Sequence, residues 1–544
     1  MSLGTVEAHP PVGAGPARCL RAAAFGAWGV PLGAAALAAI VLWISINPLA
    51  GPTNDTDSAA SVLYFQRLVS GDRLEAFVAL TSKPLLTVVY GVLWQLTHDW
   101  LALTLFTLVV GAAAVGLAAA FARRLAGFTA AAFIVTALLS WPDFRVEVAH
   151  ANSFVVAFAL WLLAGLFVTA DQPRPRAAAM ALLVAGLARP ETLWLVAAVA
   201  VGIGALAVAR RSGRNADPRR YAPLLVGFLA IPIICLHDWL LTGQPLYWLQ
   251  VARSYTILVY PTLGPVGLRA FLNNVWLLYG ASLPLGLLAA IGLVGLLQGR
   301  RWAAAGGLAF MVAGVALTLA ILGLRSTYID MRYYEELNAP LLIAAAIGVG
   351  AIVGWVSHLA RADRRLPAPL LSAAIGAIGI WSALVVAWPQ TASTVASARL
   401  DAWRKANTNL SAVMAALPVE LTTAAGSAIP VAGIGYPVAD PRTCLVYVPR
   451  PLFARVAVET GAQVTALGDS YLAFRDGSYS TLHAGQWVLH ITAADGQGDQ
   501  YTPFEVSAPT VVRSTAGGSL LVGPVVVGTD RGVWLDRIEA TSAN

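Results

Sequence analysis

Two carboxylates follow the first long apolar segment of the sequence, in the run Asn54-Asp-Thr-Asp-Ser58, and Lys83 stands later in the same polar stretch. A carboxylate can take the proton of an attacking hydroxyl group. Two carboxylates this close can also hold a divalent cation such as Mg²⁺, Mn²⁺ or Ca²⁺. The pattern therefore predicts a general base at Asp57 or Asp55, and a divalent-cation site formed by the same two side chains.

The residues after this acidic pair predict a helix. Apolar side chains at Val62, Phe65 and Leu68 recur at helical spacing, so we expect a helix over 58–69 that lies on the membrane surface. Asp57 also suits the N-cap of that helix, because an Asp side chain accepts hydrogen bonds from the free N–H groups of the first turn. Capping and catalysis remain alternative roles for Asp57.

A second group of polar residues stands further along, at Asp143, Arg145, Glu147 and His150. Their spacing brings them close to one face of a short segment. Glu147 can orient a substrate or a metal ion there, while a helix cap or a local salt bridge explains the same residues without any chemistry.

The composition excludes both a soluble globular protein and a disordered chain. Of the 544 residues, 58% are hydrophobic and 12% are charged, and the mean hydropathy is +0.70. Soluble domains carry about 25% charged residues. The 35 basic residues give a net charge of +7, but the arginines lie between apolar stretches, which points to membrane topology and to no nucleic acid partner. Three scattered cysteines form no metal-binding spacing.

About 20 consecutive apolar residues cross a bilayer, and eleven segments are candidates for doing so. They cover about 26–47, 100–122, 126–141, 151–170, 177–189, 191–209, 221–241, 275–298, 302–324, 338–359 and 366–388. The pair 177–189 and 191–209 is expected to form two half-length or re-entrant helices. They turn at Arg189-Pro-Glu191, because proline cannot continue the helical hydrogen-bond ladder.

Basic residues indicate the orientation of these segments. With the N-terminus in the cytoplasm, every short inner loop contains arginine, as positively charged loops stay inside. The long loops at about 48–99, 242–274 and 325–337 then face outward, and twelve of the sixteen acidic residues before residue 390 lie in or beside outer loops. Long connections usually carry function. We therefore expect the chemistry on the outer side.

The sequence divides into three parts. Residues 1–25 form a cytoplasmic segment, residues 26–390 a transmembrane domain, and residues 395–544 a small extracytoplasmic domain without an apolar span. Within the last part, 395–417 predicts a helix, and alternating patterns at 444–448 and 486–490 predict strands. The fold class expected is an α-helical polytopic membrane protein of about eleven membrane helices, with a C-terminal α/β or β-rich domain.

The order of these features resembles the first periplasmic loop of GT-C glycosyltransferases. An acidic pair, a helix, Ser70-Gly-Asp72 and Lys83-Pro-Leu85 follow one another as in the protein O-mannosyltransferase and aminoarabinose transferase group. Arg189-Pro-Glu191 is similar to a later element of actinobacterial arabinofuranosyltransferases, and Arg332-Tyr-Tyr with Pro340 to an element of both groups. Thr56 splits the acidic pair here, which leaves the choice between Asp55 and Asp57 open.

The resemblance implies an inverting transferase whose donor is a sugar on a polyprenyl phosphate. The acceptor is a cell-wall glycan, a lipid or a protein outside the bacterial cytoplasmic membrane. Asp57 or Asp55 would be the base, and Glu147, His150 and Glu191 would orient the acceptor. The cations that would bind the donor phosphate are Lys83, Arg145, Arg189 and Arg332. Interfacial snorkelling explains any single one of these cations equally well.

Two other functions remain open. A transporter or flippase for a lipid-linked or anionic solute would also bind a phosphate, but transporters usually place charges at mid-membrane and interrupt helices in pairs. Here one interrupted segment is recognisable, without a mate. The second of these alternatives is a non-catalytic membrane protein that binds glycan through its C-terminal domain.

Overall fold

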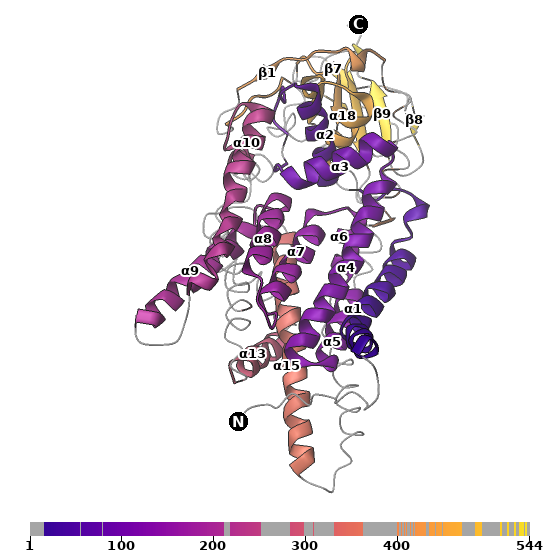
Figure 1. Cartoon of the computed structure of the whole chain (residues 1–544). Helices are drawn as coiled ribbons and strands as arrows, with labels where there is room; N and C mark the ends of the chain where they lie inside the picture. Colours follow the sequence, from indigo (N-terminus) through magenta and orange to yellow (C-terminus); the bar gives the residue numbers. More distant parts are fainter. Residues whose placement is uncertain are drawn as a thin grey trace.

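The computed structural model describes residues 16–54, 56–78, 80–211, 218–251, 283–298, 308 and 331–362, and parts of 400–540. Among the described residues, helices make up nearly all of the chain before residue 400 and short strands appear only after it, as Figure 1 shows. Nine of the eleven predicted spans fall on helices in their described parts, and the other two, 302–324 and 366–388, lie outside the described residues apart from residue 308. The polytopic helical fold class is confirmed.

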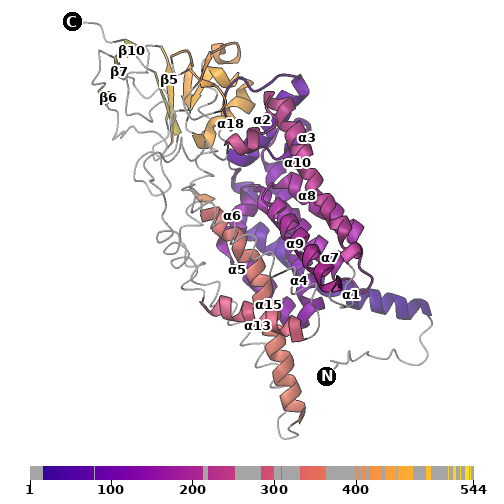
Figure 2. The same cartoon turned by 90° about the vertical axis from the view of Figure 1, so that its left-hand side faces the viewer.

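Four stretches of the described chain are long and apolar enough to cross a bilayer. They lie in α1 (Pro16–Ile46), α4 (Leu101–Ala126), the stretch Pro218–Thr242 that ends with α10 (Ala230–Thr242), and α15 (Met331–Ala362). Shorter apolar helices stand between them: α3 (Pro84–Thr97), α5 (Phe128–Ser140), α8 (Pro175–Ala188), α9 (Thr192–Arg211) and α13 (Leu283–Gln298). Short and long helices together make the bundle in Figures 1 and 2.

Small residues let the helices of this bundle approach closely. A side chain at Gly116 of α4 would come within 2.8 Å of the Pro31 carbonyl of α1. Ala38, Ala114 and Ala118 are fully buried in the core that these helices share. Close backbone approach between small residues is typical of helix packing in membranes, where lipid offers no hydrophobic driving force between helices.

Two interruptions in the helices matter for the site. The predicted break at Arg189-Pro-Glu191 is present, between α8 and α9. The sequence did not predict the second interruption, which lies between α6 (Pro142–Ala149) and α7 (Ser153–Val168). The chain bends by 111° from one of these helices to the other. Ala151 at this corner has a φ of 56°, in the left-handed region, which costs a residue with a Cβ atom about 1–2 kcal/mol.

The C-terminal region is of the α/β type. α18 (Arg450–Thr460) accompanies a five-stranded sheet of order β4-β3-β5-β9-β8, in which β3 pairs parallel with β4 and β5 and the remaining pairs are antiparallel. The predicted strands correspond to β3 (Val446–Val448) and β5 (Trp487–Ile491). The remaining bounds are β1 (Ala428–Ile429), β2 (Val438–Ala439), β4 (Leu467–Asp469), β6 (Val512–Arg513), β7 (Ser519–Leu521), β8 (Val527–Gly528), β9 (Val533–Arg537) and β10 (Glu539–Ala540).

The C-terminal region covers one end of the bundle, beside α2 (Thr56–Ser70) and α3 (Figures 1 and 2). The Trp100 indole donates to Glu459 Oε1 at 2.7 Å, and Arg67 of α2 donates to the Ala462 carbonyl at 2.9 Å. The helix predicted over 58–69 is confirmed as α2, and its placement on the membrane surface stays a prediction. Residues 58–64 are buried, because α2 packs between α3 and α18.

Candidate functional site

Asp57 and Lys83 form the first half of the site. Asp57 lies in the first turn of α2, and its Oδ2 is 2.7 Å from Lys83 Nζ. Both side chains are largely shielded from solvent, with 17% and 7% of their surface exposed. Because α2 already begins at Thr56, Asp57 stands inside the helix and is not its N-cap. The carboxylate is directed at a buried ammonium, which leaves the catalytic role of Asp57 open and removes the capping one.

The segment that carries Lys83 is fixed by hydrogen bonds from α2 and from the chain after α10. The Tyr64 hydroxyl donates to the Leu80 carbonyl at 2.6 Å. The Tyr247 hydroxyl donates to the Val78 carbonyl at 2.9 Å and accepts from the Val78 amide at 3.1 Å. Lys83 then precedes the proline that begins α3. The ammonium is therefore presented by a rigid connection, although the connection has no regular secondary structure.

A buried carboxylate supports the residue next to Lys83. Asp238 of α10 is fully buried and accepts a hydrogen bond from Ser82 Oγ through Oδ1. Its Oδ2 accepts from the Trp248 amide at 2.7 Å. Buried carboxylates are costly unless their oxygens are hydrogen-bonded, and here both are. Asp238 is not among the site residues predicted from the sequence.

The hydroxyl of Tyr64 gives this support a pH limit. Burial is the main cause that raises the pKa of Tyr64 well above its usual 10.0, and the charges of Asp238 and Asp57 add to it. The folded state binds the phenolic proton more tightly than the unfolded state does. The contribution of this proton to the free energy of unfolding is therefore fully present below about pH 10 and is lost as the pH rises further.

We therefore expect Tyr64→Phe to be less stable than the wild type near neutral pH, by about 1 kcal/mol for one lost hydrogen bond. The difference should shrink as the pH rises above about 10, because only the wild type has this proton to lose. Thermal unfolding of both proteins in detergent across that range measures it. Two curves that stay parallel would contradict the assignment.

Arg189 forms the second half of the site, at the place where the two broken helices meet. Its Nη1 donates to Asn152 Oδ1 and to Ser153 Oγ, at 3.2 Å each, and 7% of the residue is exposed. Asn152 is the N-cap of α7, since the same Oδ1 accepts from the Phe154 amide at 2.9 Å. The positive end of the α7 dipole and a buried guanidinium thus stand together, and both favour an anion.

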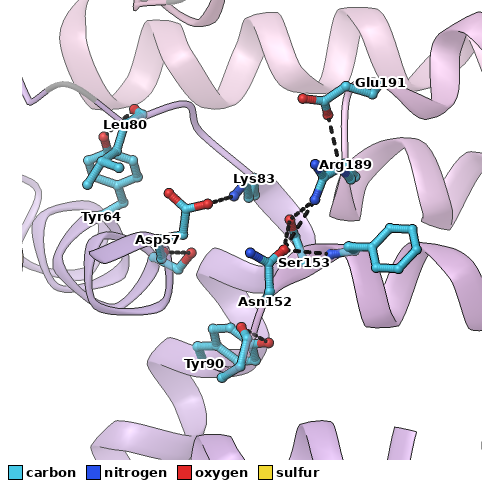
Figure 3. A network of polar contacts seen from close by, with 12 residues as sticks. Asp57, Tyr64, Leu80, Lys83, Tyr90, Asn152, Ser153, Arg189 and Glu191 are labelled. Carbon is cyan, nitrogen blue, oxygen red and sulfur yellow. Dashed lines mark hydrogen bonds and ion pairs between the residues drawn. The ribbon is translucent and has the colours of Figure 1, made fainter. Parts of the chain in front are cut away.

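Hydrogen bonds connect the two halves. Thr53, just before the acidic pair, donates through Oγ1 to the Ala149 carbonyl at 2.7 Å. Tyr90 of α3 donates to the Ala151 carbonyl at 2.7 Å. A residue before the segment that carries Asp57 and Lys83 and a residue after it therefore both bind the corner between α6 and α7. Figure 3 shows Asp57 and Lys83 beside the group of Asn152, Ser153 and Arg189.

The other predicted residues divide into three groups. Glu191 joins the site, with Oε2 3.6 Å from Arg189 Nε. Glu147 and His150 are buried at the end of α6, next to the corner that binds Arg189, whereas Arg145 is half-buried near Asp143. Asp55 and the side chain of Arg332 lie outside the described residues. The site roles of all these residues remain predictions.

The described residues do not fit a divalent-cation site. Among them, no three His, Cys, Asp or Glu side chains lie close enough together to hold a metal ion. An ammonium, Lys83 Nζ, lies 2.7 Å from Oδ2 of Asp57 and already pairs with one of the two oxygens of this carboxylate. The metal role of Asp55 and Asp57 stays a prediction, and the chemistry proposed below does not depend on it.

Sequence reasoning missed Asn152, Ser153 and Tyr90. The run Ala151-Asn-Ser153 stands before a long apolar segment, and Asn followed by such a segment is a helix-start signal. That signal could have revealed the corner between α6 and α7. The link from Asn152 to Arg189 joins positions 37 residues apart and has no local signature.

Three solved structures are similar to this chain. ArnT from Cupriavidus metallidurans, bound to undecaprenyl phosphate, shares 14% identity with a TM-score of 0.49, over 93% of this chain and 97% of that one. The archaeal oligosaccharyltransferase AglB from Archaeoglobus fulgidus, in complex with an inhibitory peptide and a dolichol-phosphate, shares 14% identity with a TM-score of 0.49, over 86% and 70%. The Archaeoglobus fulgidus oligosaccharyltransferase tethered to an acceptor peptide shares 13% identity with a TM-score of 0.45, over 85% and 69%. No family model matches the chain, and no curated protein matches it significantly.

Proposed function

We propose that this protein is a glycosyltransferase that moves a sugar from a polyprenyl-phosphate donor to an acceptor outside the cytoplasmic membrane of a bacterium. The observation that carries the proposal is the pairing of two shielded features. One is a carboxylate, Asp57, in an ion pair with Lys83, and the other is a guanidinium, Arg189, at the N-terminus of α7. Thr53 and Tyr90 hold the two features together.

Each feature suits one part of the transfer. Asp57 takes the proton of the acceptor hydroxyl, whose oxygen then bonds to the anomeric carbon of the sugar. The bond between that carbon and the donor phosphate breaks, and negative charge develops on the departing phosphate. Arg189 and Lys83 stabilise this charge, and the planar guanidinium can bind two phosphate oxygens at once. Glu147, His150 and Glu191 are the residues we assign to the acceptor.

The arrangement of the helices supports the proposed sidedness. α4 starts at Leu101, beside α18 and the C-terminal region, and ends in a turn that contains Arg123 and Arg124. In Figures 1 and 2, the lower end of α15 lies at the opposite end of the molecule from α2 and α3. Arginine-rich ends stay in the cytoplasm, so the site and the C-terminal domain would face outward. The acceptor remains open between a cell-wall glycan, a lipid and a protein.

The surface around the site suits a lipid-linked donor. α3 begins directly after Lys83, and it exposes Val88, Val92 and Leu96 on one face, at 53%, 41% and 76%. Apolar side chains left on the surface of a membrane protein are suited to lipid. A polyprenyl chain would thus find an apolar helix face next to the cations that bind its phosphate.

The experiment that tests this proposal uses the purified chain and a panel of radiolabelled sugars on polyprenyl phosphate. Release of sugar to water or its transfer to an extracted cell-envelope acceptor is expected for at least one donor. If no donor in the panel loses its sugar while the protein is folded and binds polyprenyl phosphate, the glycosyltransferase proposal is wrong.

A second candidate function has one observation in its favour. The bend between α6 and α7 and the break between α8 and α9 meet at Arg189, and transporters for anionic substrates use broken helices in this way. A transporter or flippase would move a labelled polyprenyl phosphate between the leaflets of a proteoliposome without cleaving it. The same panel of donors, recovered intact from the opposite leaflet, would favour this reading.

A further inference from the structure

The turn that precedes Asp57 is held by a residue from the far end of the chain. Asn407 is fully buried, and its Nδ2 donates to the Pro52 carbonyl at 3.0 Å and to the Asn54 carbonyl at 3.3 Å. An amide NH₂ group has two hydrogens, and here each has one carbonyl to bind. A single side chain thus fixes two backbone positions immediately before the acidic pair.

The helical segment that contains Asn407 also binds the end of the first membrane helix. Arg404, one turn before Asn407, donates through Nη2 to the Ile46 carbonyl at 2.7 Å. Carbonyls in the last turn of a helix have no partner within the helix, so Arg404 satisfies one that would otherwise be free. The connection from α1 to α2 is therefore attached to this segment at both of its ends.

The segment itself is anchored in two different cores. Leu400 packs with the membrane helices, while Leu410 and Leu417 pack with α2, α3 and the C-terminal region. Rotation of the segment would disturb both sets of contacts, and this makes Asn407 a rigid support. On the other side of the same turn, Thr53 bonds to the corner between α6 and α7.

We propose that Asn407 is a positioning residue for Asp57, and that the chain after the membrane domain thereby sets the geometry of proton transfer. The proposal rests on the proposed function. Catalytic groups must be held within about 0.5 Å of their productive positions, and the described residues 47–54 before α2 contain one short 3₁₀ turn, Pro48–Ala50, and no other helix or strand. Without Asn407, the carbonyls of Pro52 and Asn54 lose a buried donor, and Thr53 alone holds the turn before Asp57 to the corner between α6 and α7.

The test compares Asn407→Ala and Asn407→Asp with the wild type and with a control, Val419→Ala, at a residue that is 83% exposed. The Asp variant is nearly isosteric, but it replaces the NH₂ group by an oxygen that faces two carbonyl oxygens. Three quantities are measured: kcat, the KM for the polyprenyl-phosphate sugar, and the amide hydrogen exchange of residues 47–61. If Asn407→Ala cannot be recovered folded, Asn407→Ser, which keeps one donor, replaces it.

We expect kcat to fall about 10-fold in the Ala variant and further in the Asp variant, because small misplacements of a catalytic group cost this much or more. KM should change by less than about 2-fold, and exchange should accelerate only in the peptides that cover 47–61. The control should match the wild type in all three.

Two results would overturn the proposal. One is a wild-type kcat with unchanged exchange in 47–61. The other is faster exchange throughout the chain with kcat and thermal stability falling together, which a merely structural role would produce. Inactivity of the wild type itself would count against the proposed function, and unchanged exchange in 47–61 would then still decide against the positioning role.

Discussion

Replacement of Asp57 by Asn is expected to lower sugar transfer by about 10³-fold, within the range that a general base contributes. The amide keeps the shape of the side chain but cannot accept the proton of the acceptor hydroxyl. Lys83 loses its partner in the ion pair and stays available to the donor phosphate. Binding of polyprenyl phosphate should therefore be kept or strengthened. Steady-state kinetics and a binding titration on one preparation separate the two effects.

The control for this prediction is Asp72→Asn, the same change at an exposed aspartate of the same loop. It should transfer sugar at the wild-type rate. Asp55→Asn belongs in the same series, because the sequence leaves both acids open as the base. Full activity of Asp57→Asn with loss of activity in Asp55→Asn would move the base to Asp55, and full activity of both would remove the base assignment.

Replacement of Arg189 by Gln is expected to lower kcat/KM by about 10²-fold and to weaken the binding of polyprenyl phosphate. The guanidinium is the buried positive group at the N-terminus of α7, and Gln keeps a donor for Asn152 and Ser153 but carries no charge. The kcat/KM of Arg189→Lys should fall between those of the wild type and Arg189→Gln, since Lys keeps the charge but not the planar group that binds two oxygens. Kinetics with varied donor concentration measure both parameters.

Arg124→Gln is the matched control, because Arg124 pairs with the fully exposed Asp171 far along the bundle from the site. This variant should behave as the wild type. If Arg189→Gln kept full affinity for polyprenyl phosphate and lost only thermal stability, Arg189 would be a structural link between the two broken helices and not a phosphate-binding group.

The elements of this protein follow from its sequence because each has a local cause. The apolar segments, the break at Pro190 and the helix after Asp57 depend on composition, on the missing N–H of proline and on helical periodicity. The structure places helices or breaks at each of these positions that it describes. Several membrane segments form shorter helices than expected, since only four stretches of the described chain reach full span length.

The contacts of the site could be predicted only in part. Asp57, Lys83 and Arg189 were found from residue type and from their order in the chain, which also gave the resemblance to a known family. Their partners come from distant segments. Asn407 lies more than 350 residues after the carbonyls that it binds, and no periodicity or motif connects such positions. The burial of α2 could not be predicted for the same reason, because α18 comes from the far end of the chain to cover it.

The most direct test of the account uses sealed, right-side-out membrane vesicles that contain the wild-type chain and a labelled polyprenyl-phosphate sugar in the outer leaflet. An impermeant acceptor is supplied either outside or inside the vesicles. We predict that labelled product forms with the acceptor outside, and that Asp57→Asn abolishes it. Product that forms only with the acceptor inside, or labelled donor that crosses the bilayer intact while no product forms on either side, would contradict the account.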